Sequence, residues 1–401
     1  MTMLRRVLLS MLPVPQQTIL LQACLGSAEV AAEGWRGWLD HVRDPRSAFE
    51  RDQEGIKGLL PFIRYSLNKH EIEVPAGFRV YLQVSSVREE LRSRIYRQIL
   101  GDTLSALRAA GCDVIALRAA ALSESVYETN DLRHNHAIEL LIRPSDVDRA
   151  TEALKNLPFE HQEPRRAWQR HVHQYIHTTG LPLVLHTALL LLPHYRAGSD
   201  DIWANSESAV LGGVESRMLS PCENLINVCG HASYSRGRMN LRWVCDAVLI
   251  LRRHPEIEWE SVIQRVRQYR LVLPLAVMFE FLAQQLEAPI PQPVLTDLKR
   301  EAESANRSDR EAAILGVMLG AATPVSAIRR LPDDLPSRAL CARHFLFPSR
   351  TYMQWRYGYE RRWLLPAAYL YRLARFGSAA LSRRNRRSLA RSGARAVADV
   401  D

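Results

Sequence analysis

The sequence predicts a mixed α/β fold, an α+β arrangement in which a small mixed sheet lies between two helical regions. Short apolar strands enclose a helix between residues 114 and 144. Helical periodicity marks residues 17–110 before this segment and most of the chain after residue 199. With 401 residues, 47% of them hydrophobic, the chain can bury one large core or two moderate ones. We therefore expect a helical N-terminal region (1–84), a core with the sheet (85–215), a helical C-terminal domain (216–372) and a basic tail (373–401).

The central core begins with a buried strand and a helix of small residues, and a strongly apolar strand follows a polar loop. Ser145 is a suitable N-cap for the next helix, and Asp146 and Asp148 in its first turn favour the helix dipole. A third strand is expected after Gly180 and Pro182. The expected elements are strands at 114–117, 137–142 and 183–186 and helices at 119–127 and 145 to about 157.

The flanking regions have the spacing of amphipathic helices. In residues 87–110 one face is expected to carry the apolar side chains Leu91, Ile95, Ile99, Leu100, Leu104 and Leu107. Gly111 is placed to end this helix in a left-handed conformation. Beyond residue 199 the sequence predicts helices around 221–232, 240–253, 259–269 and 273–286. Four tryptophans at amphipathic spacing are expected to anchor a core or a domain interface: Trp243, Trp259, Trp355 and Trp363.

The net charge of +10 reflects an arginine-rich run near the end of the chain. Eight arginines and no acid lie between Arg372 and Arg395. Such a run is typical of a solvated, partly disordered tail, and it also has the charge to contact polyanions, either nucleic acid or an anionic membrane.

The cysteines and the apolar segments favour a cytoplasmic protein. The six cysteines lack CxxC spacing, which predicts neither a disulfide framework nor a zinc site. The apolar start of the chain is interrupted by Pro13 and Pro15, so we expect no secretory or lipoprotein signal. Because no 18 apolar residues occur without interruption, no transmembrane segment is predicted.

Four motifs in order give the sequence a family resemblance. They are the tryptophan pair Trp35 and Trp38 leading to GLLPFI at 58–63, LRAAAL at 117–122, LRHNHAIELLIRP at 132–144, and LVLHTAL at 183–189. In this pattern the sequence resembles the uncharacterised bacterial nucleotidyltransferases, a branch of the superfamily with the DNA polymerase beta type catalytic fold. The resemblance implies transfer of a nucleoside monophosphate from a nucleoside triphosphate to a hydroxyl-bearing acceptor, with Mg²⁺ as the cofactor.

The metal-binding positions implied by this resemblance are altered. Two-metal transfer needs hard oxygen ligands, and carboxylates at i and i+2 of a strand share one face. The family's two aspartates correspond to Ala137 and Glu139, and its third acid corresponds to Val184. Glu139 is therefore the single retained carboxylate and the expected metal ligand, with His186, at another family position, as a weaker candidate.

The implied phosphate-binding turn is altered as well. Arg118 stands where the family has lysine, and it keeps the positive charge but carries it on a planar guanidinium. Ala119 stands where the family has glycine, which has no Cβ and so lets backbone N–H groups approach a phosphate closely. We expect Arg118, Ala119, Ser123 and Arg133 to be the nucleotide-binding residues and Arg118 to assist Glu139 in any catalysis.

These departures leave more than one hypothesis for the function. The first is a nucleotidyltransferase that is catalytically impaired. The alternative is a protein that uses the same cleft without catalysis to bind a nucleotide, a sugar phosphate or a partner. The sequence does not identify the acceptor.

Two further interpretations concern histidines and a helical ion pair. Six histidines around the sheet suggest a transition-metal site or ordinary polar residues: His134, His136, His171, His173, His177 and His186. Arg242 and Asp246, four apart, suggest an ion pair within one helix.

Overall fold

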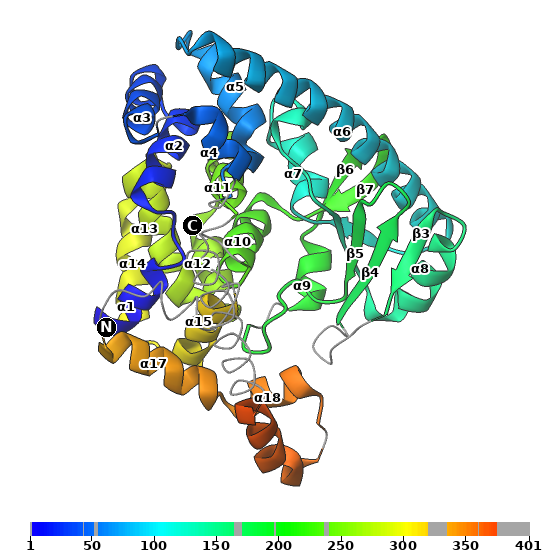
Figure 1. The fold of residues 1–401 in the computed structure, drawn as a ribbon. Helices are drawn as coiled ribbons and strands as arrows, with labels where there is room; N and C mark the ends of the chain where they lie inside the picture. The colour runs from blue at the N-terminus through cyan, green and yellow to red at the C-terminus, as the bar shows by residue number, and fades with distance from the viewer. Residues whose placement is uncertain are drawn as a thin grey trace, which may run out of the picture.

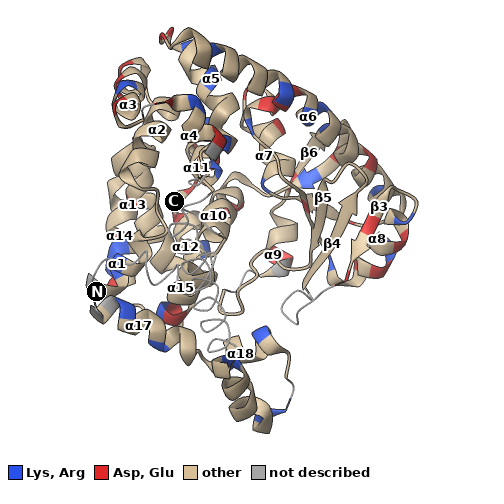
Figure 2. Ribbon diagram, in the orientation of Figure 1, with Lys and Arg blue, Asp and Glu red and all other residues tan. Residues whose placement is uncertain are grey.

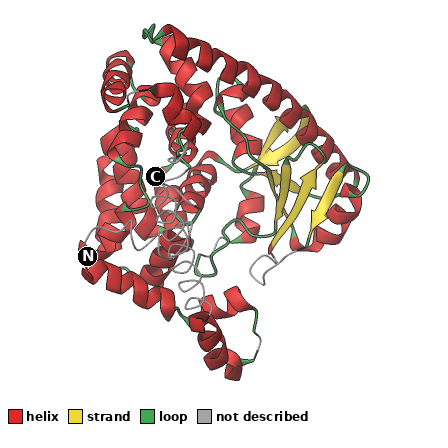
Figure 3. Ribbon diagram, in the orientation of Figure 1, coloured by secondary structure: helices red, strands yellow, loops and turns green. Residues whose placement is uncertain are grey.

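The computed structural model confirms the mixed class, with one seven-stranded sheet and predominantly helical flanks (Figures 1 and 3). The structure describes residues 2–42, 44–51, 55–163, 171–195, 198–235, 240–319, 335–359 and 361–374. The helices before the sheet are α1 (Thr2–Leu9), α2 (Pro15–Leu25), α3 (Ala28–His41), α4 (Pro45–Arg51), α5 (Leu60–Lys69) and α6 (Ala76–Ala109). The helices after the sheet are α10 (Pro221–Ala232), α11 (Arg242–Arg253), α12 (Trp259–Gln268), α13 (Val272–Leu286), α14 (Gln292–Glu303), α15 (Arg307–Leu319), α17 (Leu335–Leu346) and α18 (Arg350–Tyr357).

The sheet contains the three predicted strands at its centre and four others around them. Its elements are β1 (Val114–Ala116), α7 (Ala119–Ser125), β2 (Ile138–Ile142), α8 (Val147–Leu154), β3 (Phe159–Gln162), β4 (Val172–His177), β5 (Pro182–His186), α9 (Ser199–Ala204), β6 (Glu207–Leu211) and β7 (Val214–Met218). The strand order is β3-β4-β5-β2-β1-β7-β6. Strand β2 runs antiparallel to β1 and parallel to β5, so the sheet is mixed as expected.

The change to helices expected at about residue 199 was placed too early, because the hairpin β6–β7 follows that position. Gly212 and Gly213, both with positive φ (57° and 82°), form its two-residue turn. Two such glycines suit the tight turns whose twist matches a hairpin. Most residues of these strands are at least partly exposed, so no apolar run announces them.

One face of the sheet packs on α6 and α8 (Figure 1). Ile138, Leu140 and Leu185 point to this face and form a core with Leu100, Leu104 and Leu107 of α6. Helix α6 ends as predicted, with Gly111 at φ 69°. The opposite face carries the polar residues of the site and, beside them, a smaller apolar group. This group consists of Ile115, Leu117, Leu141, Leu189, Ile202, Trp203 and Leu219.

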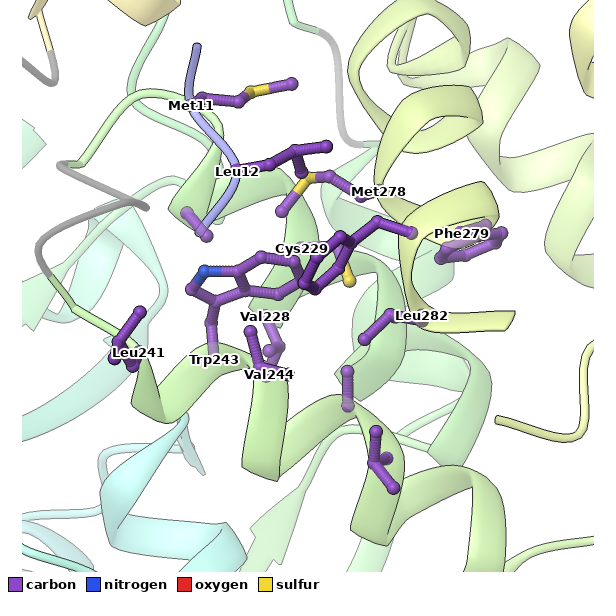
Figure 4. Packing of buried hydrophobic residues seen from close by; sticks show 14 of the residues in the cluster. Met11, Leu12, Val228, Cys229, Leu241, Trp243, Val244, Met278, Phe279 and Leu282 are labelled. Carbon is purple, nitrogen blue, oxygen red and sulfur yellow. The ribbon is translucent and has the colours of Figure 1, made fainter. Parts of the chain in front are cut away.

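The helices before and after the sheet share one large hydrophobic core. Residues of α2 and α3 such as Leu20 and Trp35 belong to the same buried cluster as Trp243 of α11 and Met278 of α13. Figure 4 shows Met11 and Leu12 from the N-terminal part beside Met278, in the group around Trp243. Thus the two helical regions that the sequence separates pack together, and the expected boundaries at 84 and 215 fall inside α6 and β7.

Some side chains lie elsewhere than expected. On α6, Leu91 and Ile95 are 55% and 49% exposed, because they point away from the sheet. Trp243 is buried, but Trp363 is 69% exposed and anchors no core. Arg372 is 2% exposed and donates to the backbone oxygen of Phe345, so it is not part of a solvated tail. The remainder of the predicted tail, from residue 375, lies outside the described residues.

Within the described part of the chain, no helix is long and apolar enough to cross a bilayer.

Candidate functional site

The site centres on Glu139, the second residue of β2, on the sheet face opposite α6. In the parallel pairing of β2 with β5, Glu139 lies directly beside Val184. Ala137 precedes β2 by one residue, and its carbonyl accepts a hydrogen bond from the Tyr96 hydroxyl at 3.2 Å. The structure therefore brings together the three positions that the family resemblance assigns to metal ligands, and Glu139 is the single carboxylate among them.

Arg118 binds the Glu139 carboxylate with two nitrogens. Its Nε donates to Oε2 at 2.7 Å, and one terminal nitrogen donates to Oε1. The Arg118 side chain is 7% exposed and that of Glu139 is 21% exposed, so the pair is largely removed from water. A bidentate guanidinium–carboxylate pair is among the strongest hydrogen-bonded ion pairs in proteins.

The backbone of Arg118 is held in an unusual conformation. Arg118 has φ 47° and ψ −111° and lies two residues after the end of β1, directly before the first residue of α7. A non-glycine residue with positive φ costs on the order of 1–3 kcal/mol and persists where the surroundings over-determine it. Such residues cluster at functional sites, and this one orients the guanidinium toward Glu139.

His186 of β5 completes the group on the sheet. Its Nε2 lies 3.3 Å from a terminal nitrogen of Arg118 and 3.6 Å from Oε1 of Glu139. Burial lowers the pKa of His186; the Glu139 carboxylate opposes this shift and the Arg118 charge adds to it, leaving the pKa below its ordinary value. His186 is therefore neutral at neutral pH.

Arg118 also decides the charge state of Glu139. Burial by itself raises the pKa of this carboxyl group, but the charge and hydrogen bonds of Arg118, with the nearby imidazole of His186, outweigh burial and hold the pKa well below its ordinary value. Glu139 is thus ionised over the whole neutral range, with its charge neutralised by Arg118.

Helix α10 contributes two residues that the sequence patterns did not single out. The Asn227 side chain accepts from Arg118 at 3.4 Å, and its Nδ2 is buried without a hydrogen-bond partner among the described residues. Burial, together with the Arg118 charge, lowers the pKa of His231 to about 3. Asn227 and His231 are four apart on the helix, a spacing that would have placed them on one face, but only the packed structure aims that face at the sheet.

The predicted phosphate turn is buried and its hydroxyl is engaged. Ala119 and Ser123 are 4% and 2% exposed. The Ser123 hydroxyl donates to the Ala119 carbonyl at 2.7 Å, within α7. Both residues lie on α7, which starts directly after Arg118, and their role toward a nucleotide stays a prediction.

Arg133 lies in a second buried ion pair, which joins the core to α11. It donates to both oxygens of Asp246, at 2.8 and 2.7 Å, and the Tyr127 hydroxyl donates to the same carboxylate at 2.7 Å. The prediction that Arg242 and Asp246 form an ion pair within α11 is therefore wrong. Asp246 binds Arg133 across the interface, and Arg242 instead donates to Asn240 and to the backbone oxygen of His134.

The remaining candidate metal ligands do not gather into a cluster. Among the described residues, no three histidine, cysteine, aspartate or glutamate side chains are arranged to hold a metal ion. His134 pairs with Glu89 of α6 at 2.6 Å. Glu124, near the site in sequence, accepts from the backbone N–H of Gly212 at 2.9 Å.

The sheet thus holds Glu139 of β2 and His186 of β5 together with Arg118, which stands between β1 and α7. The family model of uncharacterised nucleotidyltransferases matches residues 56–287, which is more than half of the chain. The chain belongs to this family. The match begins just before α5 and ends after α13, so it takes in the sheet, α6 and the helix α10 that faces the site.

No curated protein and no solved structure matched the chain in the corresponding comparisons.

Proposed function

We propose that this protein is a nucleotidyltransferase-family member, with a core of the polymerase beta type, in which metal-dependent transfer of a nucleoside monophosphate to a hydroxyl group is impaired. The observation that carries the proposal is the bidentate pairing of Arg118 with Glu139. The remaining carboxylate of the implied metal site is already neutralised by a cation of the protein itself.

The residues present do not fit a two-metal site. Mg²⁺ requires several oxygen ligands in near-octahedral geometry, and two-metal transfer requires carboxylates that reach two ions roughly 4 Å apart. Beside Glu139 stand Val184 and, two residues earlier, Ala137, neither of which has a side-chain oxygen. His186 is a nitrogen ligand, which Mg²⁺ binds poorly.

A divalent cation would also have to displace Arg118. Removing one partner of a buried ion pair costs about 3–5 kcal/mol, because the other charge remains uncompensated. The Arg118 guanidinium lies beside Glu139 where a cation would bind, and we infer that it substitutes for the cation's charge.

The same site retains groups that suit a phosphorylated ligand. Two nitrogens of Arg118 bind Glu139, and its third, Nη1, lies 3.4 Å from the Asn227 oxygen and carries donors that suit a phosphate oxygen. Asn227 adds a buried amide nitrogen without a partner among the described residues, which a ligand oxygen or a water would satisfy. These groups support the alternative that the site binds a nucleotide or a sugar phosphate without catalysis. They do not define the acceptor of any transfer.

Isothermal titration with ATP and with GTP, in Mg²⁺ and in EDTA, tests the proposal. We expect the affinity for the nucleotide to be the same with and without Mg²⁺. The Arg118→Met variant should lose binding, whereas Glu160→Ala, which removes an exposed carboxylate from β3, should bind as the unchanged protein does.

The impairment of transfer would be contradicted if the affinity for the nucleotide depended on Mg²⁺ and if pyrophosphate were released from the nucleotide in the presence of Mg²⁺. Both effects would then have to be absent from the Glu139→Ala variant. If neither nucleotide binds under any condition, the nucleotide-binding part of the proposal is wrong, and inorganic phosphate and a hexose 1-phosphate are then titrated to test the sugar-phosphate alternative.

A further inference from the structure

Helix α6 carries an exposed apolar stripe on the side that faces away from the sheet. The helix has 34 residues and runs along the outer edge of the molecule (Figure 1). The members of the stripe are Val80, Val84, Val87, Leu91 and Ile95, which are 61%, 53%, 51%, 55% and 49% exposed. Single exposed apolar residues need no explanation, but a row of them on one helix face indicates a contact surface.

The inward side of α6 is fully used by the fold. Leu82, Tyr96 and Leu100 are buried against the rest of the protein, on the face opposite the stripe. A helix that covers a sheet needs only one apolar face, and its outer face is ordinarily polar. The stripe is therefore surplus to what the fold of this chain requires.

The stripe has the spacing of a coiled-coil seam. Its members follow each other at intervals of four, three, four and four residues, which at 100° per residue confines them to a narrow strip. At 1.5 Å per residue the stripe is about 22 Å long. Valine predominates in it, a β-branched residue that packs well between the side chains of a facing helix.

Positive charge borders the stripe. Arg88 and Arg92 follow one edge and form no ion pair within the described part of the chain. Arg94 lies at the other edge, where Glu90 is the one acid, and these two form an exposed i,i+4 pair. Figure 2 shows the charged residues along α6.

We propose that this face of α6 docks an amphipathic helix of another protein, one with apolar residues at heptad spacing and glutamates or aspartates at the flanking positions. The apolar side chains of the partner would pack between those of the stripe, and its acids would meet the three arginines. Charge complementarity of this kind selects the partner and its register.

The same charges argue against other occupants. A second copy of the chain would bring its own arginine-rich edges against these, which places like charges together. Residues 375–401 of this chain carry seven arginines and two aspartates, so they have the wrong charge as well. Helices that lie in a lipid interface use tryptophan, phenylalanine and leucine on their apolar side, whereas three of the five residues here are valines.

Fluorescence anisotropy with two labelled synthetic helices tests the proposal on the full chain. The first peptide has about three heptads with valine and leucine at the a and d positions and glutamate at the flanking e and g positions, and the second has lysine in place of every glutamate. We expect the acidic peptide to bind at least about tenfold more tightly than the basic one.

Two variants and a control locate the binding on α6. Val87→Ser with Leu91→Ser should weaken binding of the acidic peptide about tenfold or more, and Arg88→Glu with Arg92→Glu should remove the preference for the acidic peptide. Val210→Ser removes a 62% exposed apolar side chain from β6 and should leave binding unchanged. Circular dichroism melting curves establish that each variant folds.

Several outcomes would overturn the proposal. Equal binding of the two peptides, or binding of neither, removes the acidic helix as the partner. Sedimentation equilibrium that shows a dimer of the unchanged protein and a monomer of the Val87→Ser, Leu91→Ser variant identifies a second copy as the occupant. Cosedimentation with phosphatidylglycerol vesicles that this variant loses identifies an anionic membrane instead.

Discussion

Replacing Asp246 is expected to destabilise the protein far more than removal of an ordinary surface charge. Asp246 on α11 is 2% exposed and binds Arg133 through both carboxylate oxygens. The Tyr127 hydroxyl donates to the same group at 2.7 Å. This arrangement joins the loop before β2 to the helical body, so one substitution disturbs both sides of the interface.

The size of the effect follows from burial. Asp246→Ala leaves the Arg133 guanidinium, whose side chain is 7% exposed, without its countercharge, and it leaves the Tyr127 hydroxyl without an acceptor. Breaking a buried pair in this way costs about 3–5 kcal/mol, and the unsatisfied hydroxyl adds about 1–3 kcal/mol. The double variant Arg133→Met, Asp246→Leu should recover much of this loss, because no charge remains buried.

Urea unfolding followed by far-ultraviolet circular dichroism measures the free energy of unfolding of each variant. Glu152→Ala serves as the control, since it breaks the exposed pair with Lys155 and is expected to cost less than about 1 kcal/mol. A loss below about 1 kcal/mol for Asp246→Ala, or a double variant less stable than Asp246→Ala, would refute the reasoning from burial.

Further predictions concern packing, pH and charge. Gly101→Ala should lower the free energy of unfolding by about 1–3 kcal/mol, since its Cβ would lie 2.5 Å from the Gly212 backbone oxygen; a melting temperature unchanged from that of Gly77→Ala, where nothing lies within 4 Å, would speak against it. The pKa of His231 is lowered to about 3 in the folded state from an ordinary value near 6.5, so the unfolded chain binds the additional proton first. Stability should therefore fall as the pH drops from about 6.5 towards 3, and urea midpoints should fall less over this window in His231→Gln. Truncation after Phe376 removes six arginines and should lower the salt concentration at which the protein elutes from heparin; an unchanged elution would contradict a role of the tail in polyanion binding.

The sequence allowed the fold to be predicted well where periodicity is strong. The strands at 114–117, 137–142 and 183–186 and the helices from 221 to 286 were found within a few residues of their predicted bounds. Their apolar patterns are local, so they are legible without knowledge of the partners. The strands β3, β4, β6 and β7 were missed, because they are partly exposed and carry few apolar residues at alternating positions.

By itself the sequence determined which residue types stand at the family's chemical positions: Glu139 as a lone carboxylate, Arg118 and Ala119 in the turn, and Val184 on the neighbouring strand. Only the tertiary structure decided which groups these residues meet. It paired Arg118 with Glu139, directed Arg133 to Asp246 rather than to the site, and brought Asn227 of α10 to the sheet. Side-chain partners more than a few turns apart depend on how helices and strands pack, and charge pairing across such distances leaves no periodic signal in the chain.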